Sequence, residues 1–293
     1  MLSILIPTYN DHCYSLVKEL KKQADELNIV YEIIVQDDAS KLYLNENSDI
    51  NNLPNCRFES NQQNVGRTKN RMILAEKASF DLILFLDADV LPEKDTFLSE
   101  YIDYHQKNKD AVIFGGYKYH NEQPEKSKIL RYKYGKSREE KPAAVRNNRP
   151  FSFVFSGNML LSKPLFLKTN FTQNENLYGM DLFFSYHLYQ IGAKINHIDN
   201  AIFHLGLEVN KVFFEKNLES VSNRKKYLAD KKGISKINPL LKYYLIIKTL
   251  KLDPWVYWIF QKFETKLKKS ILSDDPNLLS MDLYRLGYIC KKD

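Results

Sequence analysis

The chain has 293 residues, of which 44% are hydrophobic and 13% aromatic, and its net charge is +7. This length suits one large domain or two modest ones, and the apolar content excludes a disordered chain. The positive charge belongs to the C-terminal part, because residues 206–293 carry 18 basic and 10 acidic side chains whereas the rest is close to neutral. Such a basic tail is typical of proteins that bind nucleic acid or an anionic membrane.

Targeting and redox features also limit the class of protein. The sequence contains no run of about 18 apolar residues, so we expect no transmembrane helix. Residues 2–6 are mainly apolar and are not preceded by the basic region that begins a signal peptide, so we expect no signal peptide. Cys13, Cys56 and Cys290 are scattered without a zinc-binding spacing, and we expect them to be reduced thiols. Together these features predict a cytoplasmic protein.

The first 115 residues alternate between predicted strands and predicted helices. Short apolar runs indicate strands, and apolar residues at helical spacing indicate the helices between them. This alternation predicts a mainly parallel α/β sheet. The predicted strands are residues 2–6, 31–35, 56–60, 82–86 and 111–115, and the predicted helices are residues 14–27, 68–77 and 92–106.

The strand over residues 82–86 ends in Asp87-Ala88-Asp89. Burying a carboxylate is costly unless a positive charge lies near it, and Mg²⁺ typically binds one or two carboxylates together with substrate phosphates. Side chains alternate along a strand, so we expect Asp87 and Asp89 on one face. Because D-x-D is short and common, a solvated strand end or a helix cap is the alternative.

Two other predicted strands also end in polar clusters, Thr8-Tyr9-Asn10 and Asp37-Asp38. In α/β sheets, ligands bind beyond the carboxyl ends of the strands. Three polar strand ends therefore predict one ligand site at this edge of the sheet.

The pattern changes after residue 116. Residues 118–149 are polar and basic and are interrupted by Pro124 and Pro142, which predicts an excursion or mobile flap with a helix near residues 126–136. Strand character resumes at residues 151–155, 159–161, 194–198 and 201–204, with a helix at residues 181–190. The chain is expected to be helical from residue 210 onward.

Five segments, in this order, resemble those of family 2 glycosyltransferases with the GT-A fold. The resemblance implies a GT-A catalytic domain over residues 1–205 and a helical C-terminal region over residues 206–293. The segments are Ile4-Leu5-Ile6-Pro7-Thr8-Tyr9-Asn10, Ile33-Ile34-Val35-Gln36-Asp37-Asp38-Ala39-Ser40, Asn64-Val65-Gly66-Arg67 with Asn70-Arg71, Leu84-Phe85-Leu86-Asp87-Ala88-Asp89, and Tyr178-Gly179-Met180-Asp181-Leu182.

The resemblance implies a metal-dependent hexosyltransferase that uses a nucleotide sugar, most often a UDP-sugar, with Mn²⁺ or Mg²⁺ as cofactor. It implies inverting transfer to an acceptor hydroxyl, in the synthesis of a polysaccharide or another cell-surface glycan. Carried over by position, the nucleotide-sugar site comprises Pro7, Thr8, Tyr9, Asp37, Asp38, Gly66, Arg67, Arg71, Asp87 and Ala88. In this assignment Asp38 hydrogen-bonds the base, and Asp87 faces the ribose or a metal-bound water.

Metal and catalytic roles follow from the same resemblance. Asp89 matches the metal ligand of the DXD motif, with Asp87 beside it, and His204 matches a third ligand in several relatives. The alternative for His204 is a structural histidine at a strand end. Asp181 matches the general base, although Met180 stands where the family usually has another acid, and His187 replaces a later arginine. An aspartate at a helix start is also an ordinary cap.

Two further residues have less defined roles. Asn158, in Ser156-Gly157-Asn158, is predicted to touch the donor sugar or the acceptor, and a turn residue is the alternative. We interpret His197 as structural. Arg131, Arg146 and Arg149, in the basic segment, are candidates for contact with the diphosphate or with an anionic acceptor, and a solvated loop is the alternative.

The C-terminal region contains an amphipathic pattern. Trp255, Ile259 and Phe263 are spaced four residues apart, and lysines occupy another side of the same predicted helix. Residues 240–269 therefore predict contact with an anionic membrane, which suits a glycan or lipid-linked acceptor at the inner face of the cytoplasmic membrane. Packing within the chain or against a second copy in a homodimer is the alternative.

Other classes of function fit the sequence less well. A non-catalytic nucleotide-sugar-binding scaffold is supported only by Met180 and has no need of Asp87, Asp89 and Asp181 together. A nucleotidyltransferase needs a glycine-rich, basic loop after the first strand, which residues 7–11 lack. The basic charge lacks a nucleic-acid-binding motif, so we expect no nucleic acid partner.

Overall fold

The computed structural model of the protein describes residues 1–170 and 177–291, which form two compact units. The described residues of the first unit are 1–118, 140–170 and 187–206, and those of the second are 119–139, 177–186 and 207–291. The second unit thus includes two segments that precede residue 205.

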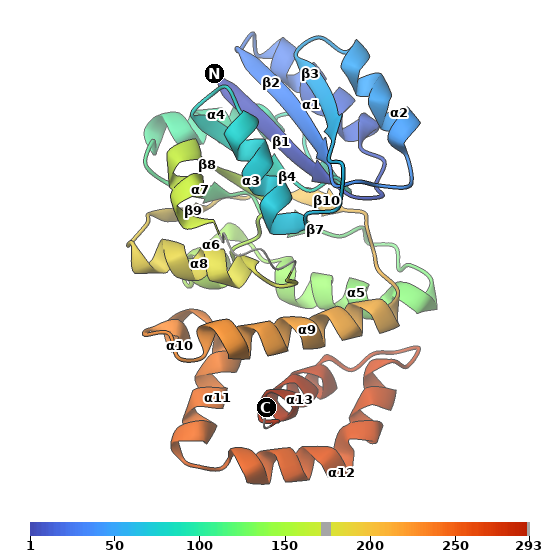
Figure 1. The fold of residues 1–293 in the computed structure, drawn as a ribbon, viewed down its shortest axis with the longest axis vertical. Helices are drawn as coiled ribbons and strands as arrows, with labels where there is room; N and C mark the ends of the chain where they lie inside the picture. The colour runs from blue at the N-terminus through green and yellow to red at the C-terminus, as the bar shows by residue number, and fades with distance from the viewer. Residues whose placement is uncertain (171–176, 292–293) are drawn as a thin grey trace. The chain divides into compact units, whose positions relative to one another are not determined.

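A seven-stranded sheet forms the centre of the first unit, in the order β3-β2-β1-β4-β8-β6-β9 (Figure 1). Strands β3, β2, β1 and β4 are parallel, β8 is antiparallel to both of its neighbours, and β9 is parallel to β6. The mainly parallel α/β sheet is therefore confirmed. The bounds are β1 Leu2–Thr8, β2 Tyr31–Asp37, β3 Cys56–Ser60, β4 Leu82–Leu86, β6 Val112–Phe114, β8 Asn158–Ser162 and β9 Ile195–His197.

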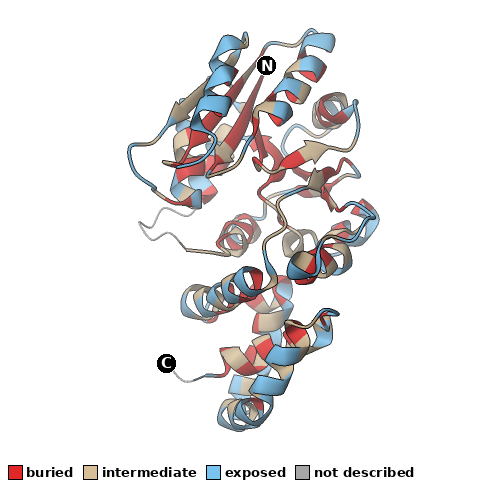
Figure 2. Ribbon diagram, turned by 90° about the vertical axis from the view of Figure 1, so that its right-hand side faces the viewer, coloured by how far each residue is buried: buried red, intermediate tan, exposed pale blue. Residues whose placement is uncertain are grey.

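The central strands are buried on both faces (Figure 2). In β1, Ile4 is aligned with Ile33 of β2 on one side and with Leu84 of β4 on the other. Such strands have nearly continuous apolar sequences because neither face meets water. The parallel register brings the carboxyl ends of β1, β2 and β4 to the same edge.

A second sheet of three strands lies in the same unit, in the order β5-β10-β7. Strand β10 (Ile202–His204) is antiparallel to β5 (Val90–Pro92) and parallel to β7 (Tyr117–Lys118). Its register pairs His204 with Val90. This sheet therefore brings His204 beside the residue that follows Asp89.

Helices cover both faces of the large sheet. Helices α1 and α4 pack together, as do α3 and α7. The β1–β2 connection through α1 and the β3–β4 connection through α3 run in opposite directions along the sheet. Because such connections are right-handed, α1 and α3 lie on opposite faces of the sheet (Figure 1). The helical segments of this unit are α1 Tyr14–Glu26, α2 Leu44–Ser48, α3 Arg67–Lys77, α4 Phe97–Lys107, α6 Ala143–Asn147 and α7 Lys163–Thr169, with 3-10 turns at Asp49–Asn52 and Pro150–Ser152.

The structure corrects two predicted elements. The helix predicted from residue 92 begins at Phe97, because Val90–Pro92 pairs with β10 instead. The strand predicted at residues 151–155 is absent from this described segment, and Pro150–Ser152 forms a 3-10 turn there.

The second unit is helical. Its core is a cluster of apolar side chains contributed by α5, α9, α12 and α13, namely Leu130, Phe213, Phe214, Phe260, Ile271, Met281 and Tyr284. Helix α8 begins in this unit. The bounds are a 3-10 turn Lys126–Lys128, α5 Ile129–Tyr134, a π-helical turn Gly135–Glu139, α8 Asp181–Gln190, α9 Asn210–Leu228, α10 Ile234–Ile237, α11 Pro239–Thr249, α12 Asp253–Ile271 and α13 Leu278–Ile289.

The basic segment 118–149 is folded, which differs from the predicted flap. Arg131 is buried, and its Nη2 lies 3.0 Å from Glu139 Oε2, which also accepts a hydrogen bond from Tyr119. Arg146 is buried in the first unit, where it donates to the carbonyls of Phe114, Gly115 and Ile198. Neither guanidinium is a solvated loop residue, because each holds backbone or side-chain oxygens in place.

Candidate active site

Two arginines hold the Asp87 carboxylate at the end of β4. Arg67 Nη2 lies 3.0 Å from Oδ2 and Arg71 Nη2 lies 2.5 Å from Oδ1. Both arginines belong to the first two turns of α3, which crosses from β3 to β4. Only 5% of the Arg71 side chain is exposed, against 47% for Arg67. Arg71 is therefore the enclosed partner and Arg67 the accessible one.

The charges around Asp87 determine its protonation. Burial alone would raise the pKa of this carboxyl group, but Arg67, Arg71 and His204 outweigh that effect and lower the pKa to about 2. The Tyr117 hydroxyl adds a hydrogen bond of 3.3 Å to Oδ2. Asp87 is therefore ionised at neutral pH.

Asp89 lies beside His204. Its Oδ2 is 3.6 Å from His204 Nε2, and its carbonyl accepts a hydrogen bond of 2.8 Å from the Leu205 amide. Burial raises the pKa of the Asp89 carboxyl, and the nearby Asp87 raises it further, whereas His204 acts in the opposite direction. A positive charge bound at Asp89 would offset this cost of burial.

Glycines allow both carboxylates to fit. A Cβ atom on Gly157 would lie 2.0 Å from Asp87 Oδ2, and one on Gly206 would lie 1.8 Å from Asp89 Oδ2. Any side chain at either position would therefore displace an acidic group.

The expected shared face of Asp87 and Asp89 does not arise from strand alternation. Strand β4 ends at Leu86, and Ala88 and Asp89 form a turn before β5. Asp87 consequently faces α3, whereas Asp89 faces His204. Ala88 between them is buried.

The donor atoms near Asp89 suit a divalent cation. Within residues 1–170 and 177–291, no three His, Cys, Asp or Glu side chains converge as a ready-made metal site. A carboxylate and an imidazole beside each other are nevertheless ligands that such cations accept, and Mg²⁺ sites often need only one or two protein ligands when substrate phosphates supply the others. Asp89 and His204 fit this arrangement, whereas Asp87 is occupied by the two arginines.

Asp37 and Asp38, at the end of β2, bind the protein's own loops. Asp37 accepts hydrogen bonds from the Ser40 amide at 2.9 Å and the Ser60 hydroxyl at 2.6 Å. Asp38 accepts from the amides of Val65 and Gly66, each at 2.8 Å. Asp38 thereby fixes the loop that leads into α3. Gly66, the last residue of this loop, has a φ of +88°.

The end of β1 lies at the same edge. Thr8 is buried and its carbonyl accepts from the Asp38 amide at 2.9 Å, whereas the Tyr9 side chain is 50% exposed. Pro7 is half-buried. The three predicted strand-end clusters therefore meet at one edge, as the parallel sheet requires.

Asn158 is buried, and its side chain bonds only within the fold in the contacts that the structure describes. Its Oδ1 accepts from the Tyr101 hydroxyl at 2.6 Å, and its Nδ2 donates to the carbonyls of Gly116 and Asn200. These bonds give the amide a structural task at the start of β8. A role in donor or acceptor contact stays a prediction.

His197 has a structural environment. Its Nδ1 lies 3.0 Å from Arg146 Nη1 and its Nε2 lies 2.9 Å from the Pro150 carbonyl. Burial lowers the pKa of His197 to about 4. The neutral imidazole thus accepts from Arg146 and donates to Pro150, as one tautomer allows.

Asp181 is the first residue of α8 and belongs to the second unit. The preceding turn rests on α9, because Glu219 accepts a hydrogen bond from the Tyr178 amide and Asn223 donates to the Tyr178 carbonyl, both at 3.0 Å. Gly179, with a φ of +83°, approaches Ser220 so closely that a Cβ atom would lie 2.1 Å from its hydroxyl. The position of Asp181 is therefore defined by α9.

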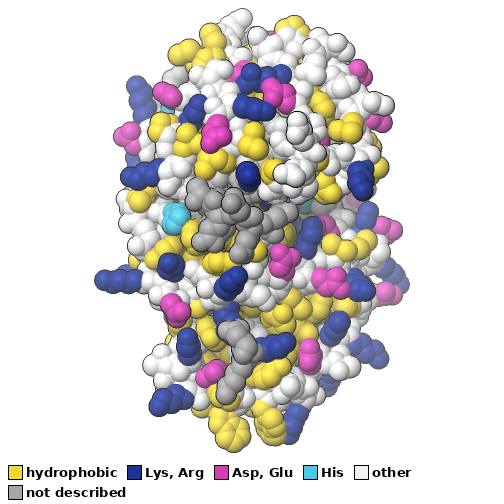
Figure 3. All heavy atoms as spheres, viewed as in Figure 1, with side chains coloured by type: hydrophobic (Ala, Val, Ile, Leu, Met, Phe, Trp, Pro, Cys, Tyr) yellow, Lys and Arg dark blue, Asp and Glu magenta, His cyan; other side chains and the backbone are white. Residues whose placement is uncertain are grey.

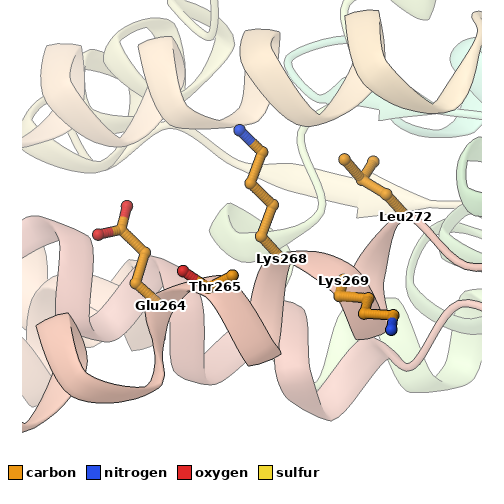
Figure 4. Close-up of a pocket in the computed structure, with 5 residues that line it drawn as sticks. All are labelled: Glu264, Thr265, Lys268, Lys269 and Leu272. Carbon is orange, nitrogen blue, oxygen red and sulfur yellow. The ribbon is translucent and has the colours of Figure 1, made fainter.

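A hollow of about 520 Å³ lies along α12 (Figure 4). It is lined by Glu264, Thr265, Lys268, Lys269 and Leu272. None of the predicted site residues lines it, so we assign it no part in the site described above.

Tyr117 and Gly206 were not predicted as site residues. Tyr117 lies in β7 and Gly206 follows β10, and the strands of this sheet lie far apart in the sequence. No local motif marks them.

Solved structures share this fold over nearly the whole chain. The S. aureus TarS structure in complex with UDP-GlcNAc matches with a TM-score of 0.52 and 17% identity, covering 98% of this chain and 90% of that chain. The mannosyltransferase PcManGT from Pyrobaculum calidifontis, in complex with GDP-Man and Mn²⁺, matches with a TM-score of 0.61 and 13% identity, covering 98% and 85%. The fold is therefore that of GT-A glycosyltransferases.

Residues 3–168 match the sequence model of the family called glycosyl transferase family 2. The chain belongs to this family, and membership supports an enzyme that transfers a glycosyl group. A sequence comparison with curated proteins gives no match.

The ion pairs of Asp87 generate a prediction about stability. Asp87→Asn should lower the free energy of unfolding at neutral pH by about 3 kcal/mol, because it leaves the enclosed Arg71 without its charge partner. Since the pKa of Asp87 is lowered to about 2, the wild-type advantage should persist above about pH 4 and shrink as the pH falls toward 2.

Urea denaturation of both proteins across this pH range measures the effect. Glu59→Gln is the control, since its pair with Lys77 is more exposed and should contribute at most about 1 kcal/mol. A stability difference that does not change with pH would show that the Asp87 charge is not its cause.

Proposed function

We propose that the protein is an inverting glycosyltransferase that moves a sugar from a UDP-sugar to an acceptor hydroxyl, in the synthesis of a polysaccharide or another cell-surface glycan. The observation that carries the proposal is the charge arrangement at the sheet edge. An arginine-bound Asp87 lies in the same turn as Asp89, which is paired with His204. Such an arrangement offers arginine side chains to the phosphates of a nucleotide diphosphate and a carboxylate to a cation bound with them.

The donor is proposed to lie across the carboxyl ends of β1, β2 and β4. Pro7, Thr8 and Tyr9 would contact the nucleoside, with the exposed Tyr9 ring available to the base. Asp38 would hydrogen-bond the base, and Asp37 would keep the Asp38 turn in shape through Ser40 and Ser60. Gly66 and the accessible Arg67 would face the diphosphate or ribose, with Arg71 holding Asp87 in place.

Asp89 and His204 would hold Mn²⁺ or Mg²⁺. When bound, such a cation neutralises the charge that develops on the diphosphate as the glycosidic bond breaks. The protein's part is to present the Asp89 oxygens and the His204 nitrogen at one place, which the Leu205 amide and Gly206 support.

Asp181 is proposed as the general base. In the reaction the acceptor oxygen forms a bond to the anomeric carbon of the sugar, the bond from that carbon to the diphosphate oxygen breaks, and the acceptor proton passes to the Asp181 carboxylate. An inverted configuration follows from this single displacement. The fixed turn before α8 supports the role because a base must be held within hydrogen-bond reach of the hydroxyl.

We further propose that α11 and α12 attach the protein to an anionic membrane surface. Within residues 1–170 and 177–291, every helix is too short or too polar to span a lipid bilayer. Trp255 is 65% exposed, and Trp258, Ile259 and Phe263 are each at least 50% exposed. Lys262 lies 3.5 Å from the centre of the Trp258 ring. Exposed aromatic rings beside lysines suit the boundary between acyl chains and anionic headgroups.

The same surface is visible in the space-filling view. Figure 3 shows hydrophobic side chains projecting at the lower end, over the C-terminal helices, with basic side chains close by. Exposed apolar patches of this kind mark surfaces that bind a partner or a membrane.

The metal proposal predicts how donor binding changes. In the presence of Mn²⁺, UDP should bind the wild type, and Asp89→Asn should weaken binding by about tenfold or more, since a direct metal ligand is lost. Isothermal titration with UDP, GDP and CDP, with and without Mn²⁺, measures this. The same substitution at the exposed Asp95 is the matched control. Binding that is equally tight without metal would contradict the proposal.

Asp181→Asn should keep donor affinity but reduce transfer by about 100- to 10,000-fold, the range that general base catalysis contributes. Binding is followed by titration with a UDP-sugar, and transfer by release of UDP in the presence of candidate acceptors. Asp230→Asn, at an exposed position of the same unit, should leave both unchanged. Full transfer by the Asp181 variant would remove this residue as the base.

Replacing Trp255, Trp258 and Phe263 by serine should reduce binding to vesicles of phosphatidylglycerol by about tenfold or more, because buried aromatic area and nearby lysines together drive attachment. Co-sedimentation with anionic and with neutral vesicles measures partitioning. Val30→Ser with Leu42→Ser is the control, since both residues are exposed in the other unit. Unchanged vesicle binding by the triple variant would contradict the proposed membrane attachment. A wild type that dimerises through this surface and binds no vesicle would contradict it as well.

A further inference from the structure

Two arginines of the second unit act on each other's charge, and neither makes a hydrogen-bonded ion pair with a carboxylate of residues 1–170 or 177–291. Arg224 is on α9 and Arg285 is on α13, two helices that pack against each other. Burial lowers the pKa of Arg224, and the positive charge of Arg285 lowers it further, to about 10. The Nε atoms of both side chains are buried and have no hydrogen-bond partner among the described residues.

Among the described residues Arg285 forms one ion pair with a carboxylate, and this pair is a long one. Arg285 Nη1 is 3.9 Å from Asp282 Oδ1, which is too long for a hydrogen bond. Asp282 is already engaged by Arg138. Only 12% of the Arg285 side chain is exposed, so solvent compensates its charge incompletely. Arginines that serve the fold are normally paired, as Arg131 is with Glu139.

The pair lies beside the start of α8. Asn223, the residue before Arg224, donates to the Tyr178 carbonyl, and Ser220, one turn earlier on α9, faces Gly179. The groups that act on the Arg224 charge from the surrounding elements are Tyr134, Tyr178 and Asp181, besides Arg285. The arginines and the proposed base therefore occupy one neighbourhood of the same unit.

We propose that Arg224 and Arg285 form a binding site for an oxyanion carried by the acceptor, either a phosphate or a carboxylate, next to Asp181. The inference rests on the proposed function, because Asp181 is the base only if the protein is a glycosyltransferase. A guanidinium presents a planar set of N–H donors that matches the oxygens of either group. A bound oxyanion removes the repulsion between the two arginines and anchors the acceptor while its hydroxyl is positioned for reaction.

The site is tested with inorganic phosphate as probe, by thermal unfolding of the full chain with saturating UDP and Mg²⁺ so that the donor site is filled. Phosphate at ten times its Kd should raise the Tm of the wild type by about 3 °C. The double variant Arg224→Gln, Arg285→Gln should lose this shift, and Arg224→Lys should keep only part of it. Acetate in place of phosphate shows whether a carboxylate is accepted as well.

Lys126→Gln is the matched control, because this basic residue is on the same unit but 76% exposed and paired with Asp274, and it should retain the full shift. Without phosphate, the double variant should melt at or above the wild-type Tm, since it relieves repulsion. A clearly lower Tm, or failure to fold, would mean that the arginines serve the fold and would overturn the proposal. A phosphate shift that is absent from the wild type, or that survives in the double variant, would also overturn it.

The two proposals fail separately. If UDP itself leaves the Tm unchanged and titration detects no binding, the donor proposal fails. The difference in phosphate response between wild type and double variant still reports on the arginine pair.

Discussion

The candidate active site depends on one electrostatic constraint. Two arginines of one helix hold a carboxylate at the end of a buried strand. Arg67 and Arg71 lower the pKa of Asp87 against the effect of burial, and Arg71 is itself almost fully enclosed. The pair fixes the start of α3 against the end of β4. Asp38 anchors the loop before the same helix through two backbone amides. The edge of the sheet is thus built by acids whose charges are satisfied by the protein.

The solvent-exposed side chains at this edge differ from the acids whose charges the protein itself neutralises. Arg67 and Tyr9 are about half exposed, and Asp89 lies beside His204. An ordered framework with a few exposed polar groups is the arrangement expected of a binding site for a charged small molecule. In the second unit Arg224 and Arg285 have a different character, because the Nε atoms of both are buried without a hydrogen-bond partner among the described residues.

Much of the first unit could be predicted from the sequence because its strands are local apolar runs. Cys56–Ser60 and Leu82–Leu86 were predicted with the observed bounds, as was the helix Asp181–Gln190. The helix predicted at residues 92–106 was wrong only in its start, because β5 pairs with β10, whose residues lie more than a hundred positions later. The basic segment 118–149 looked like a flap because its ion pairs and its burial depend on contacts that no local pattern reveals. For the same reason Tyr117, Gly206 and the arginine pair had no sequence signal.

The glycine at position 206 limits how this site can change during evolution or engineering. Because any Cβ there would lie 1.8 Å from Asp89 Oδ2, no side chain can be added from that side without displacing the acid. Variation beside Asp89 is therefore closed at position 206. A library designed to alter the surroundings of Asp89 would accordingly gain little from this position.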